Sequence, residues 1–168
     1  ALVWVTGNVM RDQAQRDGIA LARSIESYAT ASVPEESFTI GVLPPEQTAA
    51  VTEQVAGFRE LRRLRLWTVD STLLYDSEAD ATGFPDGDRL DAATRQREPD
   101  AEVVTVVSGE EFGGSESTLL DVYVPVQHDG QVVGAAEVML DYQGTTDAVA
   151  SATRTVTLVV AGGLALLW

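Results

Sequence analysis

Apolar residues recur at steps of three and four near the start of the chain, the spacing that places side chains on one face of a helix. The residues with this spacing are Ala14, Ile19, Ala22, Ile25 and Ala29. They predict one long helix over residues 11–31, which ends before Pro34. A second helix is expected to open at Pro44 and Pro45, because proline lacks the N–H that a first helical turn would leave unpaired.

Short runs rich in β-branched and aromatic residues replace the helical spacing in the second part of the chain. Five main strands are predicted, over residues 63–69, 73–75, 102–108, 119–127 and 131–142. We also expect a short strand over residues 38–40, a short helix near residues 90–97 and a last helix that begins near Thr145. A run of strands without βαβ alternation predicts an α+β fold with an antiparallel sheet.

Both ends of the chain are free of charged residues, over residues 1–10 and 155–168. A membrane-spanning helix needs about 20 mostly apolar residues. We therefore interpret residues 1–10 as the end of a first transmembrane segment and residues 155–168 as the start of a second. Residues 11–154 would then form one water-facing domain. The alternative that both ends are core segments of a soluble protein stays open.

Charge and composition exclude several functions. The chain has 26 acidic residues against 11 basic ones, all of them Arg, and a formal net charge of -15. Such a charge repels phosphate, so we expect no nucleic-acid partner. The chain has no Cys and one His, His128. This removes thiolate chemistry and multi-histidine metal sites, and nothing in the sequence places a nucleophile beside a base. We expect no cofactor, no metal and no catalytic site. The acidic residues over 76–91 are interpreted as a solvated face, and the alternative that they bind a divalent cation stays open.

Three segments carry a resemblance to a known family. Residues 64–77 form its opening hairpin, residues 119–126 its fourth strand and residues 132–142 its fifth. In this order they resemble single-Cache, PAS-like extracellular sensor domains of bacterial membrane receptors, such as sensor histidine kinases and diguanylate cyclases. The chain departs from the family at Ser71, where Gly is frequent, and at Thr68, where Asp is frequent. Residues 80–116 do not align, so the ligand of the family does not carry over.

The resemblance implies a five-stranded antiparallel sheet with the long N-terminal helix on one face. Shorter helices and loops would enclose a pocket on the other face, and the C-terminal helix would lead into the membrane. It also implies a receptor in the cell membrane whose extracytoplasmic part is this domain. The receptor would form a homodimer through the N-terminal helix, and this part of it would not be catalytic. A histidine kinase output is the leading expectation, and a diguanylate cyclase is the alternative.

Alternate side chains of a strand share a face. Leu64 and Leu66 suit the long helix, so Arg65 and Trp67 are expected to face the pocket layer. The partner of Glu137 depends on the turn between the last two strands. A three-residue loop with left-handed Gly130 pairs Tyr123 with Ala135 and Asp121 with Glu137, whereas a two-residue turn at Asp129 and Gly130 places Glu137 opposite Val122. The sequence leaves both registers open.

In the first register one cavity is lined by Arg65, Trp67, Asp121, Tyr123 and Glu137. Carboxylates and aromatic rings suit an amine, and Arg65 could hold the carboxylate of a zwitterion. The alternative is that Arg65 only neutralises Glu137 or Asp121 across the sheet. We therefore predict a ligand-sensing domain for a small amine or zwitterion. Two alternatives are a protein-interaction ectodomain with a filled core and a secreted or anchored enzyme.

Overall fold

The computed structural model describes residues 2–78, 84–108 and 115–142, and the C-terminal helix predicted from Thr145 lies outside them. The helices are α1 (Leu2–Thr30), α2 (Glu35–Ile40), α3 (Pro45–Val55) and α4 (Gly87–Asp91), and a π-helical turn, η1 (Ala92–Gln96), follows α4 directly. The strands are β1 (Leu61–Thr68), β2 (Leu73–Asp76), β3 (Asp100–Ser108), β4 (Ser115–His128) and β5 (Gln131–Asp141).

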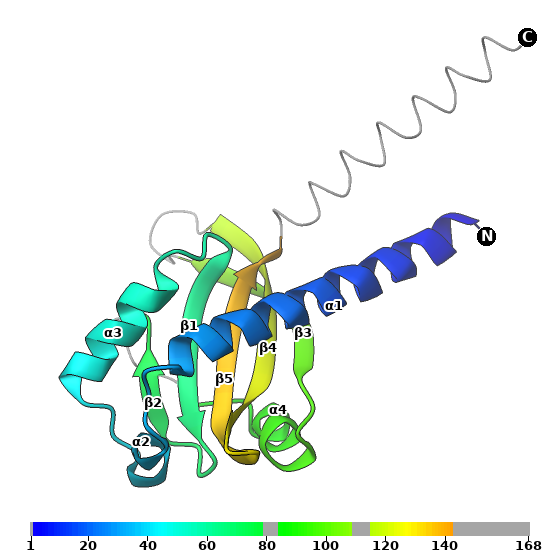
Figure 1. Cartoon of the computed structure of the whole chain (residues 1–168). Helices are drawn as coiled ribbons and strands as arrows, with labels where there is room; N and C mark the ends of the chain where they lie inside the picture. Colours follow the sequence, from blue (N-terminus) through cyan, green and yellow to red (C-terminus); the bar gives the residue numbers. More distant parts are fainter. Residues whose placement is uncertain (1, 79–83, 109–114, 143–168) are drawn as a thin grey trace, which may run out of the picture.

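All five strands form one antiparallel sheet in the order β2-β1-β5-β4-β3. α1 crosses one face of this sheet diagonally, with α3 at the same side, and α4 lies at the end of the sheet where β4 turns into β5 (Figure 1). The predicted α+β fold class, the antiparallel sheet and the long N-terminal helix on one face are therefore confirmed.

Two apolar clusters lie on the two faces of the sheet. The larger one packs Ala22, Ile25 and Ala29 of α1 against alternate strand residues such as Leu64 and Leu66. The smaller one, on the opposite face, consists of Trp67, Leu90, Ala93, Tyr123 and Ala135. This division confirms the predicted faces of β1 and shows that α4 and η1 cover one end of the face opposite α1.

Several element boundaries differ from the prediction. The segment expected as a strand over residues 38–40 is helix α2, because Pro34 can precede a helix and Glu35 and Glu36 suit the positive end of its dipole. α1 begins at Leu2 rather than residue 11. No helix among the described residues is both long enough and apolar enough to span a membrane. Residues 155–168 lie outside the described ranges.

The β4–β5 hairpin has neither predicted register. Its turn has two residues, Asp129 and Gly130, both with positive φ (48° and 76°), as a tight hairpin requires. The register then shifts between Val126 and Gln127, where β5 carries one extra residue. As a result Glu137 lies opposite Tyr123 rather than Val122 or Asp121.

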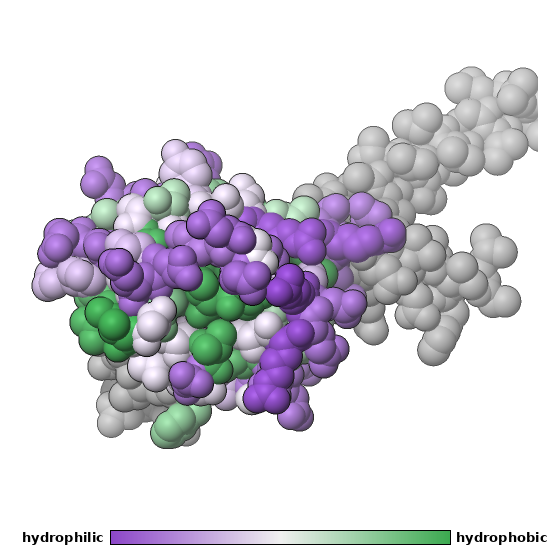
Figure 2. Space-filling model, turned by 60° about the horizontal axis from the view of Figure 1, so that its bottom comes forward, coloured by the Kyte–Doolittle hydropathy of each residue, from purple (hydrophilic) through white to green (hydrophobic). Residues whose placement is uncertain are grey.

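The surface is mostly hydrophilic, in line with the charge of the chain. Figure 2 views the end with α2 and the β1–β2 turn, where green apolar patches interrupt a purple polar surface. Exposed apolar side chains of these segments include Ile40, Val42 and Val69, which are 68, 57 and 49% exposed.

Candidate functional site

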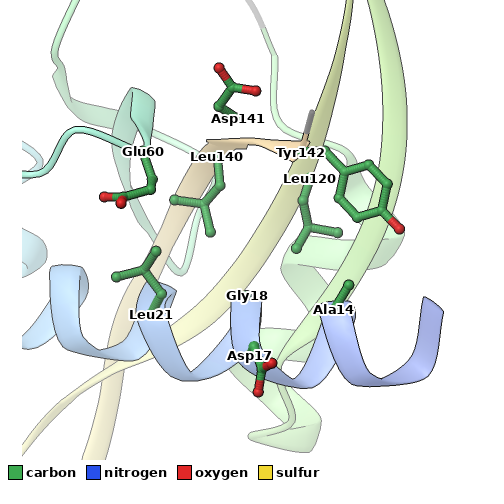
Figure 3. A pocket seen from close by; sticks show the side chains of 9 residues that line it. All are labelled: Ala14, Asp17, Gly18, Leu21, Glu60, Leu120, Leu140, Asp141 and Tyr142. Carbon is green, nitrogen blue, oxygen red and sulfur yellow. The ribbon is translucent and has the colours of Figure 1, made fainter. Parts of the chain in front are cut away.

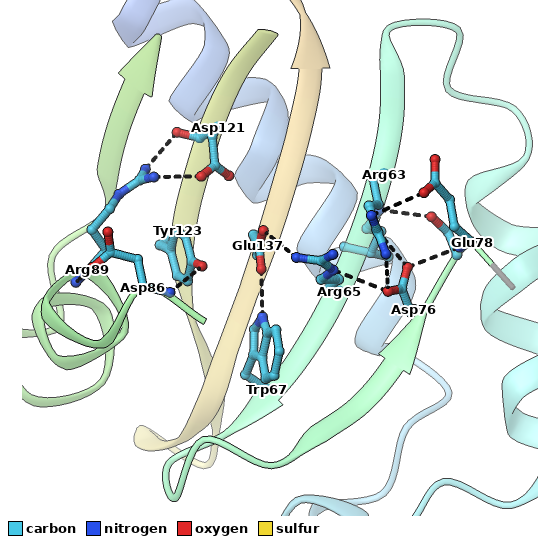
Figure 4. Close-up of polar contacts among 12 residues, drawn as sticks. Arg63, Arg65, Trp67, Asp76, Glu78, Asp86, Arg89, Asp121, Tyr123 and Glu137 are labelled. Atoms are coloured by element: carbon cyan, nitrogen blue, oxygen red, sulfur yellow. Dashed lines mark hydrogen bonds and ion pairs between the residues drawn. The ribbon is translucent and has the colours of Figure 1, made fainter. Parts of the chain in front are cut away.

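Arg65 organises the first group of polar residues on the face opposite α1 (Figure 4). Its Nε lies 3.1 Å from Asp76 Oδ2, and its Nη1 lies 3.1 Å from Glu137 Oε1. The indole N–H of Trp67 donates to the other oxygen of Glu137 at 2.8 Å. Glu137 is only 3% exposed, and each of its two oxygens accepts a hydrogen bond.

Strand pairing explains this arrangement. Arg65 is the register partner of Asp76 on β2 and of Glu137 on β5. Directly opposite residues have Cβ atoms about 5 Å apart, so a long guanidinium can reach both carboxylates. Trp67 lies two residues further along β1 on the same face and reaches Glu137 from the other side. A buried cation between two carboxylates follows from the pairing of three adjacent strands.

Arg63 extends this group toward the edge of the sheet. Its guanidinium contacts Asp76 at 2.7 Å and Glu78 at 3.1 Å. Burial alone would raise the pKa of Asp76, but hydrogen bonds from Arg63, the Glu78 N–H and Arg65 outweigh burial and hold its pKa below the usual value. Asp76 is therefore a structural anion shared by two arginines.

Arg89, on α4, centres a second group. Its Nη1 lies 2.5 Å from Asp121 Oδ2, and its Nη2 donates to the Asp121 carbonyl at 2.7 Å. Its Nε donates to Asp100 at 2.5 Å. The guanidinium also lies over the Tyr123 ring, 4.7 Å from the ring centroid. Glu102 lies further away, with its Oε2 4.0 Å from Nη1. Three carboxylates and an aromatic face therefore surround one cation.

Asp121 is the one described side chain with a buried oxygen that lacks a partner. Its Oδ1 is inaccessible and accepts no hydrogen bond, and its side chain is 9% exposed. Burial raises the pKa of Asp121 to about 6, and nearby Glu137 adds to this effect, although Arg89 opposes it. A buried carboxylate with one unused oxygen is costly unless another group can use that oxygen.

Tyr123 links the sheet to α4. Its hydroxyl accepts a hydrogen bond from the Asp86 N–H at 3.2 Å, and the Asp86 side chain caps α4 by accepting from the N–H groups of Asp88 and Arg89. Burial raises the pKa of Tyr123, and the charge of Glu137 adds to the shift. The phenol therefore stays neutral and fixes the start of α4 over the sheet.

The remainder of this face opens into a groove of about 580 Å³. Its lining residues are Arg62, Arg63, Glu78, Val106, Ser117, Leu119, Met139 and Asp141. Met139 is the register partner of Asp121, and Leu119 lies two residues before Asp121 on the same strand face. The groove therefore includes two sheet neighbours of Asp121, although Asp121 itself does not line it.

A smaller pocket of about 100 Å³ lies on the other face, between α1 and the sheet (Figure 3). It is lined by Gly18 and Leu21 of α1 and by Leu120 and Leu140 of the sheet, among others. Its volume is well below the roughly 300–1,000 Å³ of typical small-molecule sites. No three His, Asp or Glu side chains within the described part of the chain gather as metal ligands.

Comparison with solved structures identifies the fold. The ligand-binding domain of the Campylobacter jejuni chemoreceptor Tlp3, in complex with 4-methylisoleucine, has a TM-score of 0.50 at 14% identity, over 83% of this chain and 56% of that one. The chain has a Cache-like, PAS-like fold. No protein-family model and no curated protein match its sequence.

Two further sensory domains resemble this Cache-like fold more distantly. One is the ligand-binding domain of the Pseudomonas aeruginosa PAO1 amino acid chemoreceptor PCTC with GABA (15% identity, TM-score 0.48, 85% of this chain and 62% of that one). The other is the periplasmic sensory domain of Campylobacter jejuni Tlp1 (14%, 0.47, 83% and 58%). The chain thus spans less than two thirds of the length of each domain.

The Cache-like fold places all five predicted site residues on the face opposite α1. Arg65, Trp67 and Glu137 form one hydrogen-bonded group, whereas Asp121 and Tyr123 belong to the group of Arg89. Trp67 and Tyr123 are 1 and 2% exposed, so neither ring faces open solvent.

Sequence reasoning missed Asp76 and Arg89 as members of the site. Asp76 lies opposite Arg65 because the β1–β2 register shifts between Leu66 and Trp67, an irregularity that the predicted hairpin did not contain. Arg89 lies on a five-residue helix and contacts Asp121 across 32 residues of sequence, and no spacing pattern signals such a contact.

Proposed function

We propose that the chain is the extracytoplasmic ligand-sensing domain of a bacterial transmembrane receptor. A histidine kinase is the proposed output, and a diguanylate cyclase is the alternative. The observation that supports sensing most strongly is the unused buried oxygen of Asp121 beside an open groove. A structural carboxylate has its oxygens satisfied, as Glu137 has, whereas a binding carboxylate keeps capacity for a ligand.

The proposed ligand is a small amine or zwitterion. Asp121 and Glu137 supply negative charge, Trp67 and Tyr123 supply aromatic faces, and Arg65 would hold the carboxylate of a zwitterion. Because Arg65 is bound by Asp76 and Glu137, a ligand carboxylate must replace one of these contacts. The Tlp3 domain of similar fold is in complex with 4-methylisoleucine, which is consistent with a zwitterion.

We propose that the two ends of the domain transmit the signal. Ligand binding would favour one arrangement of α4 and the sheet, and a ligand can shift such an equilibrium only by its different affinities for the two states. In the sequence, β5 precedes the proposed membrane segment at residues 155–168, and α1 begins within the one proposed at residues 1–10. We further propose that the receptor lies in the cell membrane as a homodimer through α1.

A thermal-shift screen of amines, amino acids and carboxylates tests this function, because a ligand of the folded state raises its stability by mass action. We expect a saturable rise in melting temperature with one chemical class, and its loss in Asp121→Asn. Glu53→Gln is the matched control, because Glu53 lies exposed on α3. A flat response across the panel would count against small-molecule sensing.

A protein-interaction ectodomain without a small ligand is the second candidate. It is favoured by the complete pairing of Arg65 with Glu137 and Asp76 and by the burial of Trp67, which fill one end of the layer. This candidate predicts no response to the panel. It also predicts that Asp121→Asn leaves receptor signalling intact as long as the domain stays folded.

A further inference from the structure

The groups that bind the Arg89 side chain could also bind an organic cation. Its guanidinium is bound by Asp121 and Asp100 and lies over the face of Tyr123. A carboxylate beside an aromatic face is the chemistry that proteins use for guanidinium and ammonium ligands. Arg89 belongs to α4, a five-residue helix. This helix contacts the sheet through Arg89 and through Leu90, which packs in the apolar cluster of Trp67 and Tyr123.

The fit of Arg89 to Asp121 is incomplete. A guanidinium can bind both oxygens of a carboxylate at once. Arg89 instead binds Oδ2 and the backbone carbonyl of Asp121, and Oδ1 remains buried without a partner. The tether to α4 and the contact with Asp100 hold the guanidinium in this one-sided position. A free cation has no such restraint.

The groove supplies a place for the remainder of a ligand. Leu119 and Met139 line it, and both adjoin Asp121 on the sheet. Arg89 lies on the other side, with α4, at the covered end of the same face. A cation that reaches Asp121 from the groove would keep its apolar part over Leu119 and Met139.

We propose that Arg89 is an intramolecular occupant of a cation subsite at Asp121, and that a ligand with a guanidinium or ammonium group replaces it. This inference rests on the proposed sensing function and adds its regulation and ligand class. Displacement removes the main charged contacts between α4 and the sheet, so ligand binding is coupled to release of α4. The apparent affinity of the wild type then equals the intrinsic affinity of the free subsite multiplied by the fraction of molecules in which Arg89 has left it.

The test is chemical replacement of the missing side chain. Arg89→Ala removes the internal cation, and ethylguanidinium is the probe, with binding measured by isothermal titration calorimetry and by thermal shift on the full 168-residue chain. We expect Arg89→Ala to bind ethylguanidinium about tenfold or more tightly than the wild type does. The double variant Arg89→Ala with Asp121→Asn should lose this gain.

Arg95→Ala is the matched control, because Arg95 belongs to the neighbouring η1, is 79% exposed and pairs only with Asp91 among the described residues. It should bind the probe no better than the wild type. Arg89→Gln, which keeps most of the aliphatic stem, replaces Arg89→Ala if the latter does not fold. Equal binding by wild type, Arg89→Ala and Arg89→Gln would overturn the inference, as would a gain that persists in the double variant.

The same data separate this inference from the proposed function. Tighter binding of ethylguanidinium by Arg89→Ala, with no wild-type response to any natural compound, would support the subsite and count against sensing. A wild-type ligand that needs Asp121 but binds Arg89→Ala no more tightly would support sensing and overturn the role of Arg89.

Discussion

The indole N–H of Trp67 on β1 donates to Glu137 on β5 at 2.8 Å, while Arg65 holds the other oxygen of the same carboxylate. Glu137 therefore joins an aromatic ring and a cation across two strands at a buried position. Its negative charge balances Arg65, whose side chain is only 11% exposed.

Glu137→Ala should be strongly destabilising. It leaves Arg65 with Asp76 alone and removes the acceptor of Trp67, and loss of one partner of a buried ion pair typically costs about 3–5 kcal/mol. Urea unfolding at pH 7 measures the loss. Glu53→Ala, at an exposed position on α3, should change the free energy of unfolding by less than about 0.5 kcal/mol. A loss below about 1 kcal/mol in Glu137→Ala would contradict this account.

The free energy of unfolding should depend on pH through the titration of Asp121. Burial raises the pKa of Asp121 from 3.8 in its ordinary state to about 6 in the folded protein. Between these values the folded state binds more protons than the unfolded state, so this group lowers the free energy of unfolding as pH rises through the window. The wild type should therefore gain stability relative to Asp121→Asn when the pH falls from 7 to 4.5.

Urea unfolding of both proteins at the two pH values measures this difference, which should be of the order of 2 kcal/mol. Asp76 does not interfere, because its pKa lies below the usual value and it stays ionised in this window. Asp70→Asn, at an exposed turn position, should show no such pH dependence relative to the wild type. A difference that is constant between pH 4.5 and 7 would show that Asp121 titrates normally.

The cap of α4 should control the stability of the segment that carries Arg89. Asp86 accepts hydrogen bonds from the N–H groups of Asp88 and Arg89, and loss of an N-cap side chain costs about 1 kcal/mol. Asp86→Ala should therefore speed hydrogen exchange in α4 and η1 more than in the sheet. Asp86→Asn keeps an acceptor oxygen and serves as the control. Equal exchange in the two variants would exclude a capping role.

Gly134 should tolerate no side chain. A Cβ at this position of β5 would lie 2.2 Å from the Trp67 carbonyl oxygen and 2.8 Å from the Phe38 ring. Because the first of these atoms belongs to the backbone, relief requires the strands to separate, and we expect Gly134→Ala to cost about 3 kcal/mol or more in urea unfolding. Gly57→Ala is the control, since nothing lies within 4 Å of its added Cβ. Similar stability of both variants would refute the close approach.

The parts of the fold that depend on local pattern could be predicted from the sequence. Period-two alternation placed Leu64 and Leu66 against α1 and Arg65 and Trp67 on the other face, because the alternation of a strand does not depend on its partners. The segment at residues 38–40 was mispredicted because three apolar or β-branched residues are too short to separate a strand from a helical turn.

The sequence by itself determined the order of the five strands along the chain, the α+β class, the charge of the chain and the face of β1 that carries Arg65 and Trp67. Only the tertiary structure decided the partner of Glu137, because one extra residue near Val133 shifts the hairpin register without a local signal. Only the tertiary structure brought Arg89 to Asp121, since the contact joins a short helix to a distant strand. Local periodicity encodes which way a side chain points, whereas its partner depends on how whole elements pack.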